Sequence, residues 1–177
     1  MKQNLQKQLI RAIASNDMFG VKMLLSFGAS PNQVSPMWWQ MPFFVKAKMP
    51  LLVAVEKNSN QIVKLLLLAG ANPNKQGHNG MTPLTFACGT GSIEIVQSLL
   101  AAGANVNLPD ETGLPLFHAA VAPSKDVLEL LLTHGADPSA VLQGTLRYFS
   151  LPPVILKTLI DFGGEAPPEI LEFLDGL

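Results

Sequence analysis

Apolar residues recur along this chain in a phrase that ends with a leucine pair and, three residues later, with Gly-Ala. The phrase is complete around four glycines, Gly28, Gly70, Gly103 and Gly135, and an incomplete copy ends at Gly163. These marker glycines are 42, 33, 32 and 28 residues apart. Such a spacing, with small insertions and deletions, is typical of a repeat array. We therefore expect similar units stacked in a row.

The central unit, residues 70–103, predicts two short helices. Residues 82–84 (Thr-Pro-Leu) open the first helix, because proline is tolerated in a first helical turn but not inside a helix. A glycine-rich break follows at residues 89–91. Ser92 is then placed to cap a second helix, in which apolar residues recur at i, i+3 and i+7 and form one apolar face. Gly103 is expected to end this helix in a left-handed conformation.

These motifs resemble those of the ankyrin repeat. TPLTFA at residues 82–87 stands where that family has TPLH-x-A, and GANPN and GANVN stand where it has GADVN. The resemblance covers roughly residues 5–165. It implies an all-α fold, an ankyrin-repeat solenoid of stacked helix-turn-helix units with projecting hairpin or finger loops.

We expect one ankyrin-repeat domain over residues 1–177, with about five repeats of which the first and last are divergent. The expected units are approximately 5–32, 48–74, 81–107, 114–139 and 140–166, followed by a C-terminal capping helix at 167–175. A terminal unit needs a polar outer face because nothing stacks on it. In the first unit, four side chains are expected to supply this face: Lys2, Gln3, Lys7 and Arg11.

The fourth unit is one residue short, and the sequence leaves two places for the gap. If the gap lies in the turn between the two helices, His118 takes the position of the family's TPLH histidine. If it precedes Pro115, Phe117 takes that position. By the resemblance, a histidine there is expected to tie neighbouring loops together by hydrogen bonds.

The first finger loop is enlarged. Nine more residues separate Gly28 from Pro50 than separate Gly70 from Pro83, and the segment 33–49 is rich in aromatic residues. It contains five candidate partner-binding residues: Trp38, Trp39, Phe43, Phe44 and Lys46. Two interpretations stay open. The aromatic side chains pack back on the first units as a satellite core, or they anchor a partner, since interface hot spots are enriched in tryptophan.

Composition adds limits. The 177 residues are 48% apolar and 14% charged, enough for one elongated core. The single Cys88 excludes a disulfide framework and fits a reducing compartment, and no apolar run reaches the ~18 residues of a membrane helix. We therefore expect a cytoplasmic protein.

The net charge differs between the two parts of the chain: residues 1–109 carry a net charge of +6 and residues 110–177 a net charge of −7. This asymmetry reflects either an unselected surface or a partner-facing one.

No pattern in the chain predicts an active site. The three histidines share no metal-ligand spacing, Cys88 is expected to be a buried hydrophobe, and the Gly-Thr-Gly break at 89–91 lacks the preceding strand and the lysine of a phosphate loop. We expect no enzyme activity, no cofactor, no metal, no nucleic acid and no membrane partner.

The resemblance implies a non-enzymatic protein-protein interaction module or adaptor that binds a partner protein through its finger loops and concave face. In addition to the insertion, the candidate residues are Lys75, Gln76, His78, Asn79 and Met81 in one finger and Leu108, Asp110 and Glu111 in the next. The free protein is expected to be monomeric. The alternatives are a regulatory or structural subunit of a larger complex, or a pathogen effector that uses the same surface on host proteins.

Overall fold

The computed structural model describes residues 2–34, 49–122, 124–144 and 151–176. Over these residues the regular structure is helical, with no strand. The helices are α1 (Lys2–Ala14), α2 (Met18–Ser26), α3 (Pro50–Glu56), α4 (Asn60–Leu68), α5 (Pro83–Thr90), α6 (Ile93–Ala101), α7 (Pro115–Val121), α8 (Lys125–Thr133), α9 (Pro138–Gly144), α10 (Pro153–Asp161) and α11 (Pro168–Asp175), with a 3₁₀ turn η1 (His78–Gly80) between α4 and α5.

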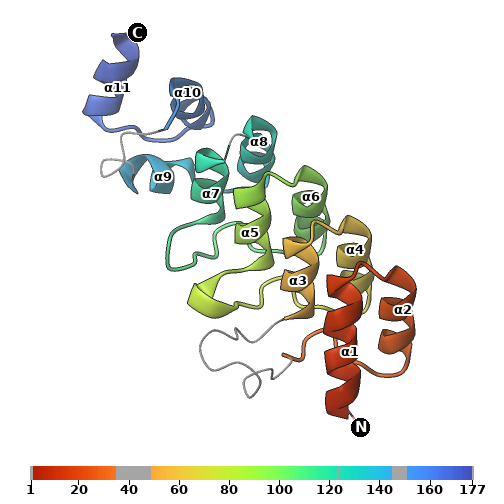
Figure 1. Ribbon diagram of the computed structural model, residues 1–177. Coiled ribbons are helices and arrows are strands. Elements are labelled where there is room, and N and C mark those ends of the chain that lie inside the picture. The colour runs from red at the N-terminus through yellow and green to blue at the C-terminus, as the bar shows by residue number, and fades with distance from the viewer. Residues whose placement is uncertain (1, 35–48, 123, 145–150, 177) are drawn as a thin grey trace.

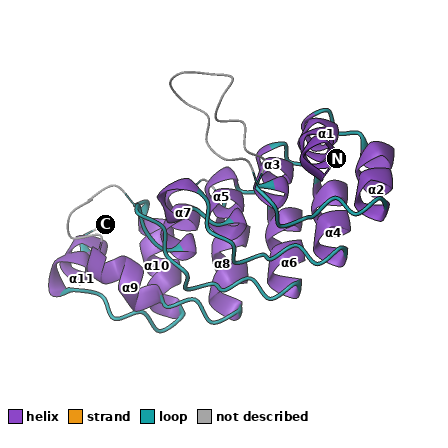
Figure 2. Cartoon of the chain, turned by 90° about the horizontal axis from the view of Figure 1, so that it is seen from below, coloured by secondary structure: helices purple, strands orange, loops and turns teal. Residues whose placement is uncertain are grey.

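The helices form antiparallel pairs that stack into an elongated array, with the two chain ends at opposite ends of the stack (Figure 1). First helices contact first helices, from α1 through α3, α5 and α7 to α9, and second helices contact second helices from α2 through α4 and α6 to α8. The two layers run side by side along the array (Figure 2). The predicted all-α solenoid of helix-turn-helix units is therefore confirmed.

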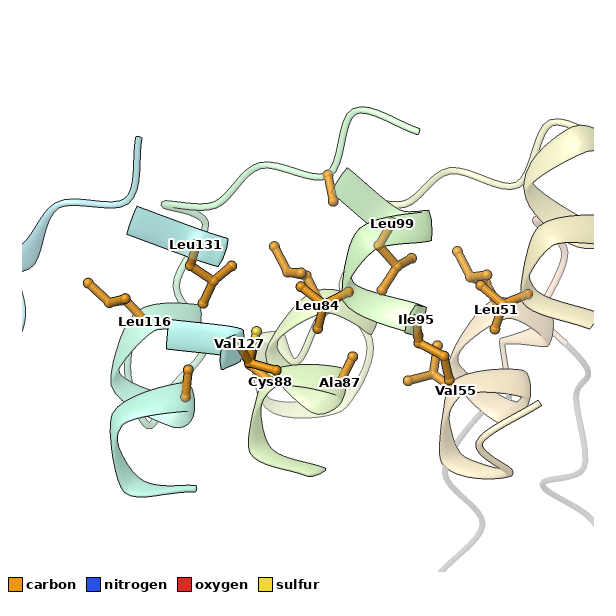
Figure 3. Close-up of a cluster of buried hydrophobic side chains, with 14 of the residues drawn as sticks. Leu51, Val55, Leu84, Ala87, Cys88, Ile95, Leu99, Leu116, Val127 and Leu131 are labelled. Carbon is orange, nitrogen blue, oxygen red and sulfur yellow. The ribbon is translucent and has the colours of Figure 1, made fainter. Parts of the chain in front are cut away.

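The core repeats one arrangement from pair to pair. Leu51, Leu84 and Leu116 each follow the proline that opens a first helix, and all three are buried. They lie in a row across α3, α5 and α7, with Leu99 and Leu131 of the second helices beside them (Figure 3). Each pair thus buries its apolar side chains against its neighbours as well as within itself, as expected for a solenoid.

Local capping departs from the sequence-based expectation at Ser92. The predicted helix start is correct, since Ser92 occupies the N-cap position of α6, but its side chain caps no backbone amide. Its hydroxyl instead donates to Asn58 Oδ1 in the preceding unit, over 2.8 Å. At the start of α5, where proline in the first turn was the predicted start signal, the structure also has a reciprocal capping box. Thr85 N donates to Thr82 Oγ1 (3.0 Å), and Thr82 N donates to Thr85 Oγ1 (2.9 Å).

The marker glycines end the second helices as predicted. Gly70, Gly103 and Gly135 have φ of 84°, 84° and 85°, in the left-handed region. A Cβ at any of the three would meet no atom within 4 Å. The requirement for glycine there is consequently one of backbone conformation rather than of space.

Replacement of Gly103 by valine should lower the free energy of unfolding by about 1–2 kcal/mol or more, because a β-branched residue is strained at positive φ. Gly103→Asn is the matched variant, since asparagine tolerates this region and the site has room for it. Urea titration measures both. Equal stabilities of the valine, asparagine and wild-type chains would contradict a conformational role.

The first unit shows both polar and apolar side chains to solvent. Of the side chains expected to form its polar outer face, Arg11 of α1 is exposed and Lys7 is half-buried. The second helix of this unit, α2, and its C-cap place Phe19 and Phe27 in solvent. At the other end, α9 contains the buried Leu142, and residues 145–150 lie outside the described residues. No helix in the described ranges has the length and apolar character needed to cross a bilayer.

Candidate protein-interaction surface

Two finger loops are described in full: the middle finger, residues 72–82, and the next finger, residues 105–114. The middle finger folds back on itself, with Gly77 N donating to Met81 O over 2.8 Å, and its tip is the turn η1. In this tip Asn79 has φ 60° and Gly80 has φ 70°. The next finger closes by a hydrogen bond from Asp110 N to Gly113 O, over 2.9 Å.

The two fingers are joined directly. Glu111 N donates to Asn79 O over 3.0 Å, and Gln76 Nε2 donates to Pro109 O over 3.1 Å. A Cβ at Gly80 would lie 3.2 Å from Asp110 Cα, so a glycine permits this close approach. Predicted residues from both fingers are thus brought together in one continuous strip.

A ladder of asparagine side chains connects the bases of the fingers. Asn74 Nδ2 donates to Gly103 O (2.9 Å), and its Oδ1 accepts from Asn105 N (2.7 Å), so one side chain satisfies two backbone groups of the next unit. Asn32 makes the same pair of bonds to Gly70 O and Asn72 N (2.8 and 2.7 Å), and Asn107 makes it to Gly135 O and Asp137 N (3.1 and 3.3 Å).

The ladder was missed in the sequence analysis, although its signal was present. Asparagine stands four residues after the marker glycine in the first three units, and Ser139 takes that position in the fourth. Ser139 Oγ accepts from Glu165 N over 3.1 Å and continues the series. The positions of the fingers along the array are therefore set by polar contacts that hydrophobic periodicity does not reveal.

A charged cluster holds the next finger on α7. Asp110 Oδ1 accepts from Thr112 N (2.7 Å), Thr112 Oγ1 (2.6 Å) and Gly113 N (2.9 Å), while Asp110 Oδ2 lies 3.1 Å from His118 Nε2. The Asp110 side chain is only 2% exposed. His118 therefore ties down the loop that precedes its own helix.

The histidine position of the family's motif belongs to Phe117 rather than to His118. Pro115 opens α7 as Pro83 opens α5, so Phe117 is aligned with Thr85. The missing residue of the fourth unit consequently lies in the finger, before Pro115. The Phe117 ring packs under this finger: a Cβ at Gly113 would lie 3.0 Å from it.

The pKa of Asp110 is lowered from its ordinary value. Burial by itself raises the pKa of this carboxyl group, but the hydrogen bonds from Thr112, Gly113 and His118 to the ionised form outweigh burial. An acid with a lowered folded-state pKa stabilises the fold above its unfolded-state pKa, about 4, and this contribution is lost as the pH falls through the folded-state pKa.

Asp110→Asn should lower the free energy of unfolding at pH 7 by about 1–3 kcal/mol, because a buried, charge-assisted set of hydrogen bonds is weakened. The difference from wild type should shrink when melting is measured below about pH 4, where the unfolded-state carboxyl is protonated. Glu111→Gln removes the same charge from the adjacent, exposed position and should leave the melting temperature unchanged. A pH-independent difference would contradict the assigned role of the carboxylate.

The remaining candidates lie in different settings. Gln76, Asn79 and Glu111 are exposed, and Met81 and Leu108 are half-buried. The half-buried Lys75 donates from Nζ to Asn32 O, which connects the middle finger to the first one. His78 lies in the backbone turn η1. The insertion candidates Trp38, Trp39, Phe43, Phe44 and Lys46 lie outside the described residues.

The single cysteine lies in the core. Cys88 is fully buried in α5, and burial raises the pKa of its thiol to about 12, so the nucleophilic thiolate is strongly disfavoured. No group of three His, Cys, Asp or Glu side chains that could hold a metal ion occurs in this part of the chain.

The comparison with protein families decides the classification. The family description "Ankyrin repeats (3 copies)" matches residues 51–141, which is just over half of the chain. The chain belongs to the ankyrin-repeat family. Ankyrin repeats generally mediate protein-protein interaction and are a non-catalytic fold.

Two curated relatives carry similar ankyrin regions. The chain is 36% identical over 80 residues to the 2-5A-dependent ribonuclease of Mus musculus, covering 45% of this chain and 10% of the relative. It is 34% identical over 128 residues to the transient receptor potential cation channel subfamily A member 1 of Homo sapiens, covering 71% of this chain and 11% of the relative. The chain thus spans about a tenth of the length of each, and the likeness concerns their ankyrin regions alone.

Proposed function

We propose that this ankyrin domain is a non-enzymatic recognition module or adaptor that binds a partner protein through its finger strip. The strip consists of the exposed Gln76, Asn79 and Glu111 with the half-buried Met81 and Leu108 beside them. Lys75 and Asp110 belong to its support, because their charged groups are engaged within the array. The single Cys88 and the absence of a disulfide framework suit a reducing compartment, and we place the module in the cytoplasm.

The observation that carries this proposal is the direct joining of the two fingers. Backbone and side-chain bonds from Glu111 and Gln76 fix the tips relative to each other, and the asparagine ladder fixes their bases. Groups that are ordered before association lose little conformational entropy when they bind. A rigid strip that combines exposed polar groups with the half-buried apolar side chains of Met81 and Leu108 is suited to binding a protein partner.

The proposal is tested with a triple variant, Gln76→Ala, Asn79→Ala and Glu111→Ala. Pull-down from cell extract with the intact chain identifies partners, whose affinity for purified wild type and variant is then measured. We expect a loss of at least about tenfold, because hot-spot residues near the centre of an interface cost about 2 kcal/mol or more when they are truncated to alanine.

The matched control changes the opposite face. Gln97 on α6 and Glu129 on α8 lie on the second-helix layer, away from the fingers, and Gln97→Ala with Glu129→Ala should leave affinity unchanged. Melting curves of all chains check that the fold is retained. The proposal fails if the control loses affinity and the finger variant does not.

The insertion belongs to the same proposal as a second contact region. Trp38→Ala and Trp39→Ala are each scored for melting temperature and partner affinity. A loss of affinity at unchanged melting temperature assigns that tryptophan to recognition, since exposed anchors contribute to binding and not to folding. A lowered melting temperature at unchanged affinity makes it part of a satellite core. If neither quantity moves for either tryptophan, the insertion has no place in the binding surface.

We also propose that the whole chain is one domain of five units, 5–32, 48–74, 81–107, 114–139 and 140–166, with a capping helix at 167–175. Five helical pairs, from α1–α2 to α9–α10, support this division, and α11 follows the last pair. Because neighbouring units share their core, we expect a single cooperative unfolding transition rather than separate domains.

A further inference from the structure

One apolar stripe on α2 has no covering element among the described residues. Phe19, Met23 and Phe27 are four residues apart and therefore follow one another along one side of the helix and its C-cap. Phe19 is 74% exposed, Phe27 is 65% exposed, and Met23 is more than a third exposed. Val21, on the opposite side of α2, is fully buried in the array. We call these three exposed residues the head patch.

The head patch differs from the same positions in the three central second helices. Counted from the marker glycine, the positions of Phe19 and Phe27 are nine residues and one residue before it. The equivalent residues are Gln61 and Ala69, Glu94 and Ala102, and Asp126 and His134. All six are exposed and either polar or small. At the other end of the array, α10 and its C-cap have Val154 and Phe162 at these positions, 60% and 44% exposed. Bulky apolar side chains therefore stand at these positions in the two end pairs of the array and not in the three central ones.

A second apolar surface lies at the other end of the array, on α11. Ile170 is buried toward the array, while Leu171 and Phe173 on either side of it are close to half exposed. The rest of the helix surface is acidic, with Glu169, Glu172 and Asp175 exposed. We call Leu171 and Phe173 the tail patch. The apolar arc of α11 is thus wider than the part that the array covers.

The surroundings of the two patches have opposite charge. Residues 1–34 contain four basic residues and one acidic residue, a net charge of +3, and the exposed Lys22 precedes Met23 of the head patch on α2. Residues 151–177 contain one basic and five acidic residues, a net charge of −4. Two heads or two tails would repel each other, whereas a head and a tail attract.

We propose that the head patch of one copy binds the tail patch of a second copy, so that the chain associates head to tail. The two patches lie at opposite ends of an elongated array, so one molecule cannot join its own head to its own tail (Figure 1). A contact between two different surfaces leaves a free head and a free tail after each step, and it generates open chains or rings. At high protein concentration this replaces the expected free monomer.

The test uses two blocked variants of the full chain. Phe19→Ser with Phe27→Ser removes the head patch, and Leu171→Ser with Phe173→Ser removes the tail patch. Sedimentation equilibrium of the wild type should give an average mass that rises with concentration above the 19.0 kDa of one chain. Each blocked variant alone should associate at least about tenfold more weakly, as expected when central apolar contacts are lost.

The decisive sample is the mixture of the two blocked variants. One still has a tail and the other still has a head, so the mixture should form a one-to-one dimer and nothing larger. A symmetric head-to-head or tail-to-tail contact would give no such mixed dimer and would overturn the proposal. So would a wild type that sediments as a single chain throughout the micromolar to millimolar range.

Two controls separate this contact from general stickiness and from misfolding. Val121→Ser removes an exposed apolar side chain from α7, in the middle of the array, and should leave association unchanged. Lys22→Glu should weaken association at low salt, and the difference should narrow in about 1 M NaCl, where the Debye length is about 3 Å. All variants change exposed side chains and should melt as the wild type does. Equal weakening by Val121→Ser would overturn the assignment of the contact to the two ends.

Discussion

No helical pair in this chain can bury its apolar face alone. Leu51, Leu84 and Leu116 are buried in α3, α5 and α7, which lie against one another, and the second helices α4, α6 and α8 are stacked in the same way. Each pair is therefore stabilised by its neighbours, and the order of the pairs along the chain is also their order in space. This dependence on the next unit explains why the repeat period, rather than any helix propensity, determines the architecture.

The polar contacts between units also depend on the stacking of neighbouring pairs. Burying the apolar faces brings backbone carbonyl and amide groups at the helix ends close to the next unit, where they need hydrogen-bond partners. Asn74 supplies both an acceptor and a donor, and Ser92 and Asn58 join the turns at the other edge. The fingers stand on this polar framework, so the positions of their bases follow from the stacking of the units, while the bonds between the loops fix their tips.

Features that recur with the repeat period could be predicted from the sequence, whereas side-chain contacts that occur only once could not. Marker glycines, the prolines that open first helices and the apolar positions were all readable, because each recurs with the period. The reciprocal capping of Thr82 and Thr85, the Asp110 cluster and the redirected Ser92 hydroxyl depend on where single atoms lie across a loop. The head patch was not predicted for a different reason: a terminal unit of a repeat array is expected to present polar side chains such as Arg11 to solvent, and the exposed Phe19 departs from that rule.

Ser139 has a mechanical consequence. Load applied to the two ends of a stacked array passes through every junction in series, so the weakest junction sets where the array separates. Asn32, Asn74 and Asn107 each cross their junction with two hydrogen bonds, whereas Ser139, a single hydroxyl, crosses the next one with its bond to Glu165 N. Under tension, the segment from α9 onward is expected to peel away first, while the units that carry the joined fingers keep their shape.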